Sequence, residues 1–331
     1  MYGDSVVPAQ SPSPKPQSHD ASSNRLLEAK LLHHYYTSTS NSVSSPDDYN
    51  QWHNVFPEAA TAHAYVLDSV LAFTALHLAY LEPNSRQTWL GIGSHYNNKA
   101  CSEFRKVVGH VSTSTLWPAL VCSIYIALFA IARIALVGHK IQSSHLADVL
   151  QTRTLLQGCL FFHDAMESLN IRSGIMTESQ LSRDIPRRDD RPLPVIPGPT
   201  ICRMAALVLE KLQTEPVQPR FEVCRVACQT LMDGMDSKYT VETQGRNVFL
   251  WPLSLNDSFM GLLQAKEFPA RLVFSLYALG LHFFKGFWYI GDAGYRLGRE
   301  LLPLSEPVSE YWVDVTASIR AEFEVDRAVQ F

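Results

Sequence analysis

The sequence has no excess of basic residues. Its 28 lysines and arginines face 32 aspartates and glutamates, which gives a formal net charge of −4 over 331 residues. A protein that tracks a phosphate backbone needs a positive field, so direct binding to nucleic acid is disfavoured. Charged residues make up only 18% of the chain and hydrophobic residues 46%. This composition is too apolar for a disordered protein and typical of a globular one.

Closely spaced cysteines are also missing. The nearest pair, Cys224 and Cys228, has no second pair and no histidine at the spacing of a zinc site. We therefore expect reduced thiols in the core, no disulfide framework and no bound metal. The scattered cysteines are Cys101, Cys122, Cys159, Cys202, Cys224 and Cys228.

The common catalytic signatures are absent as well. The sequence contains no H-E-x-x-H zinc helix, no G-x-S-x-G nucleophile turn, no glycine loop for phosphate and no dinucleotide fingerprint. We therefore expect no cofactor. The N-terminus has no secretory signal, which predicts an intracellular protein, nuclear or cytosolic.

One long apolar run, residues 116–137 (LWPALVCSIYIALFAIARIALV), has the length of a membrane span. Pro118 lies near its start, Arg133 lies near its end, and no basic cluster beside it would orient insertion. We interpret the run as a helix buried in the core of a large helical protein, and we expect no membrane span.

Helical periodicity recurs through the chain, and no alternating strand pattern of useful length is present, which predicts an all-α fold. Residues 1–24 are rich in proline and serine and are expected to form a disordered arm. Residues 25–331 are expected to form one helical domain with a polar, proline-rich loop near 170–199. The predicted helices are 25–36, 59–81, 86–110, 116–137, 145–169, 199–213, 219–239, 247–264, 269–289, 293–302 and 308–323, with a loop at 37–48.

Four sequence blocks resemble the fungal-specific regulatory domain of zinc-cluster transcription regulators, in particular the sterol uptake control proteins. The blocks are LLEAKLLHHYYTSTS, VLDSVLAFTALHLAYL, GSHYNNKACSEFRKVV and WPLSLNDSFMGLLQAKEFPARLVFSLYALGLHFFKGFWYIGDAGYRL. They are helix-packing patterns and not catalytic signatures, so they indicate a fold family more directly than an activity.

The resemblance implies an all-helical domain that lies C-terminal to a zinc cluster, responds to an apolar ligand in the sterol branch and controls gene activation. This sequence lacks the cysteine cluster of that family. We expect a stand-alone regulatory-type domain that binds a sterol-like or terpenoid-like small molecule or a partner protein. A start upstream of Met1 and a homodimer remain open alternatives.

The candidate ligand-binding residues are aromatic or lie on an apolar helix face. Dense aromatic side chains near the C-terminus could line an apolar cavity or fill a tight core. His77 lies on a face with Val70 and Phe73, where an imidazole must find a partner or stay neutral. It is interpreted as a satisfied core histidine or as a ligand contact. The candidate set is His77, Trp251, Phe283, Phe284, Phe287 and Trp288.

A second hypothesis is a cofactor-independent enzyme of fungal secondary metabolism on the same fold. A shaped apolar cavity can accelerate the cyclisation or cycloaddition of a terpenoid or polyketide by orientation, with one hydrogen-bond donor. His77, Tyr65 and Tyr277 are the candidate donors. No residue in the sequence requires this activity.

Overall fold

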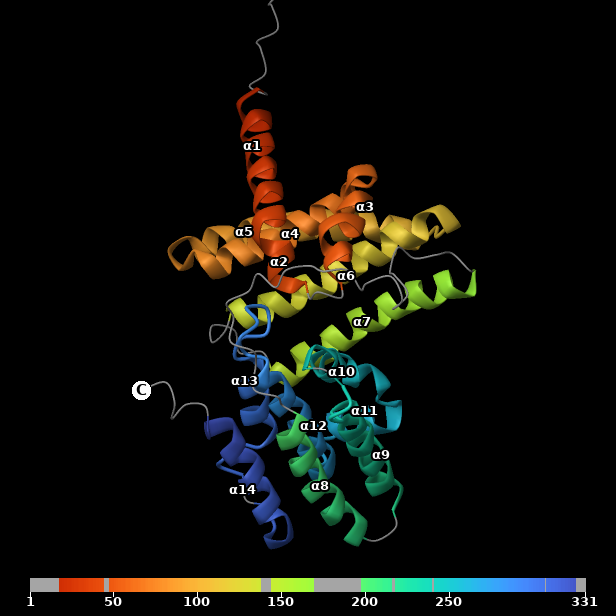
Figure 1. Ribbon diagram of the computed structural model, residues 1–331, viewed down its shortest axis with the longest axis vertical. Helices are drawn as coiled ribbons and strands as arrows, with labels where there is room; N and C mark the ends of the chain where they lie inside the picture. The colour runs from red at the N-terminus through yellow and green to blue at the C-terminus, as the bar shows by residue number, and fades with distance from the viewer. Residues whose placement is uncertain are drawn as a thin grey trace, which may run out of the picture.

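The computed structural model describes residues 18–44, 48–137, 144–169, 198–215, 218–239, 241–306 and 308–325. Within these ranges every regular element is a helix, which confirms the all-α prediction. The helices form two stacked groups, which we call the first layer (α1–α6) and the second layer (α8–α14), with α7 running between them (Figure 1).

The first layer is built around α4 (Ala64–Leu81), which is buried on almost every side. It packs against α5 (Arg86–Val108), α6 (Thr113–Val137), α3 (Phe56–Ala62) and α1 (Ser18–His34). A short α2 (Ser40–Val43), two π-helical segments, η1 (Tyr35–Thr39) and η2 (Gln51–Val55), and a 3-10 turn at Pro83–Ser85 complete the layer. Because α4 is apolar all round, it forms the centre of this core.

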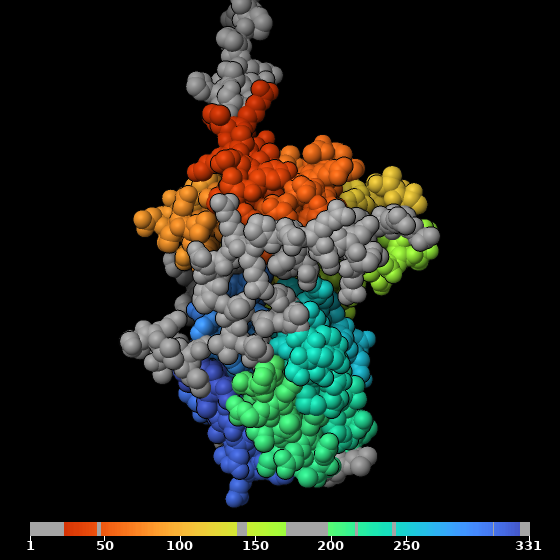
Figure 2. Space-filling model, in the orientation of Figure 1, coloured from red at the N-terminus to blue at the C-terminus, as the bar shows by residue number. Residues whose placement is uncertain are grey.

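The second layer surrounds α12 (Phe268–Phe283) in the same way. Its other helices are α8 (Gly198–Thr214), α9 (Pro219–Gly234), α10 (Val241–Ser254), α11 (Asp257–Gln264), α13 (Ala293–Leu301) and α14 (Glu310–Val325). The two layers lie at opposite ends of the molecule in the space-filling view (Figure 2). Each layer therefore has a core of its own.

Helix α7 (His145–Ser168) packs on α6 of the first layer and on α10 and α13 of the second. Glu300 of α13 accepts hydrogen bonds from the backbone N–H of His145 (2.6 Å) and from the Ser144 hydroxyl. A carboxylate at this position satisfies free N–H groups and complements the helix dipole. The Arg153 guanidinium donates to the carbonyl of Pro252 (2.8 Å). Both contacts attach α7 to the second layer.

Two described helices, α4 and α6, are long and apolar enough by length and composition to cross a membrane. In their most apolar windows, 78% of α4 and 50% of α6 are buried within the fold. Both helices contribute to the first-layer core. Their packing therefore accounts for the apolar run at 116–137, which is helical as predicted.

Several predicted helices end earlier or break. The expected 59–81 helix is interrupted at His63, whose backbone is extended (φ −132°, ψ 107°). The expected 247–264 helix breaks before Asn256, whose side chain caps α11 by accepting from the Phe259 N–H (2.9 Å). The expected 269–289 helix ends at Phe283, and turns follow up to Asp292.

The expected loop at 37–48 is wrong for residues 37–43, which lie in η1 and α2. Buried Thr39 and Ser40 explain the helical course, since tertiary contacts outweigh the low helix propensity of this Ser/Thr-rich stretch. Helix α1 begins at Ser18, earlier than the expected Arg25. The rest of the expected arm, residues 1–17, and the expected loop from 170 to 197 lie outside the described residues.

Candidate functional site

The six candidate ligand-binding residues do not form one cluster. Trp251 is 4% exposed and lies in the second-layer core, where its ring stacks on Tyr277 (centroids 5.7 Å apart). Its indole N–H donates to the carbonyl of Ala227 (3.1 Å). The Trp251 side chain is therefore fully occupied by protein contacts, at a site separate from His77 and Trp288.

Three of the candidate aromatics, Phe283, Phe284 and Phe287, lie at the end of α12 and in the turn that follows. Phe284 is buried in the second-layer core, and Phe283 and Phe287 pack partly buried against it. The rings of Phe284 and Phe287 are 6.1 Å apart. These residues hold the turn on the second layer.

Trp288 lies in the same turn but packs into the first-layer core. Its ring stacks on His77 at a centroid distance of 4.9 Å and lies 5.2 Å from Phe73. Its indole N–H donates to the hydroxyl of Ser42 (2.9 Å). We call this side chain, which is 5% exposed, the Trp288 anchor.

His77 is enclosed by this anchor and by the first layer. Its Nδ1 lies 3.0 Å from the Thr39 hydroxyl, and its ring lies 5.1 Å from that of His34. It is 5% exposed. The geometry is that of a core histidine with a polar partner and an aromatic stacking face.

The π-helical segments bring together a buried group that sequence reasoning missed. The Tyr35 hydroxyl lies 2.5 Å from the Tyr125 hydroxyl and donates to the carbonyl of Trp52 (2.7 Å). Burial raises the pKa of Tyr125 well above its usual value, so both phenols stay protonated. π-Helical turns often mark functional positions, and here they orient Tyr35 and Trp52 inward. The only sequence signal was the aromatic content of these segments.

Two histidines of this region predict a pH dependence of stability. Burial lowers the pKa of His34 and of His53 from the usual 6.5. Neither Nε2 atom has a hydrogen-bond partner among the described residues. Between the lowered pKa and 6.5 the unfolded chain binds more protons than the folded one. The contribution of these two histidines to the free energy of unfolding should therefore be constant above pH 6.5. It should fall as the pH drops below 6.5.

Urea unfolding at about pH 7.5 and about pH 5.5 measures this dependence. Carboxylates also contribute to acid sensitivity, so the double variant His34→Gln/His53→Gln is the comparison. We expect the variant to lose less stability than the wild type over this interval. An equal loss in both proteins would show that His34 and His53 do not cause the pH dependence.

The cysteines behave as core thiols. All six are free, and the four most buried are Cys122, Cys159, Cys224 and Cys228. Burial raises the pKa of Cys224 and of Cys228 to about 12, which disfavours the thiolate that zinc binds. Among the residues that the structure describes, no group of three or more His, Cys, Asp or Glu side chains is placed to hold a metal ion.

The three candidate donors of the enzyme hypothesis lie in separate surroundings. Tyr65 packs beside Phe104 in the first layer, and its buried hydroxyl has no described partner. Tyr277 lies under Trp251 in the second layer. Neither these tyrosines nor His77 lines the groove described next. The structure therefore does not bring them to one reaction site.

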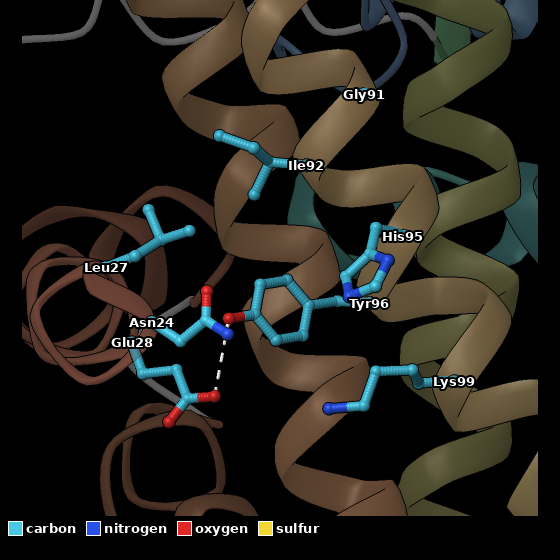
Figure 3. A pocket seen from close by; sticks show the side chains of 8 residues that line it. All are labelled: Asn24, Leu27, Glu28, Gly91, Ile92, His95, Tyr96 and Lys99. Carbon is cyan, nitrogen blue, oxygen red and sulfur yellow. Dashed lines mark hydrogen bonds between the residues drawn. The ribbon is translucent and has the colours of Figure 1, made fainter. Parts of the chain in front are cut away.

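A surface groove of about 250 Å³ lies between α1 and α5 (Figure 3). Helix α1 contributes Asn24, Leu27 and Glu28, and α5 contributes Gly91, Ile92, His95, Tyr96 and Lys99. The Tyr96 hydroxyl donates to the Glu28 carboxylate across the groove (3.4 Å). Burial, followed by the nearby Glu28 charge, raises the pKa of Tyr96 to about 12. Sequence reasoning missed this groove.

Comparison with known proteins finds one family. Residues 30–186 match the family model of the fungal specific transcription factor domain. A curated relative in Gibberella zeae, a Zn(2)-C6 fungal-type transcription factor, is 33% identical over 91 residues, which cover 26% of this chain and 18% of that relative. The chain thus matches less than a fifth of the relative's length. The matched region overlaps the first three sequence blocks, and the fourth, at residues 251–297, lies outside it.

Proposed function

We propose that this chain is the regulatory part of a transcription regulator. The proposal starts from residues 30–186, which match the family model of the fungal specific transcription factor domain. The chain would respond to a small molecule with an apolar body or to a partner protein, and would not itself contact DNA. The formal net charge of −4 supports a role without phosphate contacts. We expect it to act in the nucleus.

The observation that carries the proposal is the position of the Trp288 anchor. The matched region ends at residue 186, yet the core of its helices includes Trp288, which comes from the second layer. Because packed cores adopt discrete arrangements, movement of the second layer would alter the packing around His77. Such a contact can transmit binding on one layer to the other.

Regulation has more support than catalysis. A cofactor-free catalyst needs a cavity with a donor pointing into it. The candidate donors His77, Tyr65 and Tyr277 lie in separate parts of the cores, and the aromatic candidates are engaged with protein side chains. We therefore propose the regulatory role alone.

The test is a reporter assay with the full chain fused to a heterologous DNA-binding domain. We expect the fusion to change reporter output relative to the DNA-binding domain alone at equal protein level. Trp288→Ala should remove most of this effect, and Phe161→Ala, at a 63% exposed position, should preserve it. Equal output from the wild-type fusion and the DNA-binding domain alone, across growth conditions, would overturn the proposal.

A further inference from the structure

The groove between α1 and α5 is lined by apolar and by polar side chains from both helices. Leu27 and Ile92 present apolar side chains, whereas Glu28, His95 and Lys99 present polar ones (Figure 3). A concave surface with apolar walls and a few convergent polar groups is the usual form of a small-molecule site. Its volume of about 250 Å³ is enough for a small ligand.

Gly91 provides part of this space. It lies within helix α5, where glycine costs about 1 kcal/mol relative to alanine. A Cβ atom built at Gly91 would have no heavy atom within 4 Å. Packing therefore does not require glycine at this position, and a larger side chain would extend into the groove without displacing the protein.

The groove has an unbalanced negative charge. The Lys99 ammonium is already paired with the Asp68 carboxylate (2.9 Å), whose side chain is only 10% exposed. Glu28 has the Tyr96 hydroxyl as a hydrogen-bond donor but no ion pair among the described residues. A carboxylate has about four acceptor positions, so most of those of Glu28 remain available. The charge left for a ligand is therefore that of Glu28.

We propose that this groove binds a small molecule with a primary ammonium group on an apolar body. The ammonium donates to the Glu28 carboxylate, a charge-assisted hydrogen bond that is stronger than a neutral one. The apolar body lies against Leu27 and Ile92 and occupies the space beside Gly91. This inference rests on the proposed function for its regulatory meaning, and it assigns a ligand class to that function.

The test uses 2-phenylethylamine as the probe, with 2-phenylethanol and 3-phenylpropionate as the neutral and anionic analogues. Binding to the purified full chain is measured by calorimetry and by ligand-observed NMR. We expect the amine to bind more tightly than both analogues. Glu28→Gln should weaken binding of the amine by about tenfold, because the charge-assisted hydrogen bond between the ammonium and the carboxylate is lost.

Two further variants make the test specific. Gly91→Leu should abolish binding of the amine by filling the groove, while its circular dichroism and unfolding midpoint show that it folds. Glu103→Gln removes an exposed carboxylate that pairs with Lys106 on the same helix, and it should leave binding unchanged. Failure of the amine to bind in preference to its analogues, or undiminished binding by Gly91→Leu, would overturn the proposal.

The binding assay tests the groove proposal and the reporter assay tests the regulatory role, so each proposal can be wrong without the other. If the reporter responds to the fused chain and the amine does not bind, the groove proposal is wrong and the regulatory role stands. If the amine binds at Glu28 and the reporter never responds, the groove proposal stands as a binding site and the regulatory role is wrong.

Discussion

Trp288→Ala is expected to lower the free energy of unfolding by about 3–5 kcal/mol, the range for removing a buried aromatic side chain. The indole is 5% exposed, stacks on His77 and donates to Ser42. Its removal leaves a cavity in the first-layer core, beside His77 and Phe73. Urea unfolding followed by circular dichroism measures the change.

Phe161→Ala is the matched control for this loss. Phe161 is 63% exposed on α7, so its truncation should change stability by no more than about 0.5 kcal/mol. If Trp288→Ala lowers the free energy of unfolding by less than about 1 kcal/mol in the same assay, the Trp288 anchor contributes little to the stability of the first-layer core.

The second large effect is expected for Gly294→Ala, at the point where α13 crosses α12. A Cβ atom at this position would lie 2.3 Å from the backbone nitrogen of His282 and 2.6 Å from the carbonyl oxygen of Ala278. Backbone atoms of a packed helix cannot move aside as a side chain can, so the helices must separate. We expect a loss of about 3 kcal/mol, at the upper end for overpacking, measured by urea unfolding.

Gly91→Ala is the control for Gly294→Ala, because both glycines are helical and only one is crowded. With no heavy atom within 4 Å of its Cβ, the Gly91 variant should gain up to about 1 kcal/mol from helix propensity. Equal effects of the two substitutions would contradict the close approach of α12 and α13.

Sequence periodicity predicted the long helices well, because their apolar faces repeat at helical spacing. The helices at 86–108 and 113–137 agree with the expected ranges to within a few residues. The break at His63 was not predictable, since it depends on how the short α3 packs against α4. The same holds for residues 37–43, which are helical because buried tertiary contacts outweigh local propensity.

The candidate residues were recognised singly, but their arrangement was not. His77 and Trp288 were both singled out, yet nothing in one sequence shows that they stack. The prediction of a helix through residue 289 was the main obstacle, because it placed Trp288 on the same helix as Phe283. Helix α12 in fact ends at Phe283, and Gly286 lies just beyond, in the turn that carries Trp288 to the first layer.

The groove was missed for a different physical reason. Glu28 and Lys99 belong to separate amphipathic helices, and charged residues on such helices are usually solvated surface positions. Only the packing of the first layer brings α1 beside α5. The one signal available was Gly91, an interior helical glycine that local propensity does not favour.

Amide hydrogen exchange in the wild type and in Trp288→Ala tests most directly whether the second layer completes the core of the first. We expect the amides of α4, which carries His77, to lose protection in the variant although the substitution lies in the turn after α12. Unchanged protection of α4, with losses confined to the second layer, would show that the second layer does not complete the first-layer core.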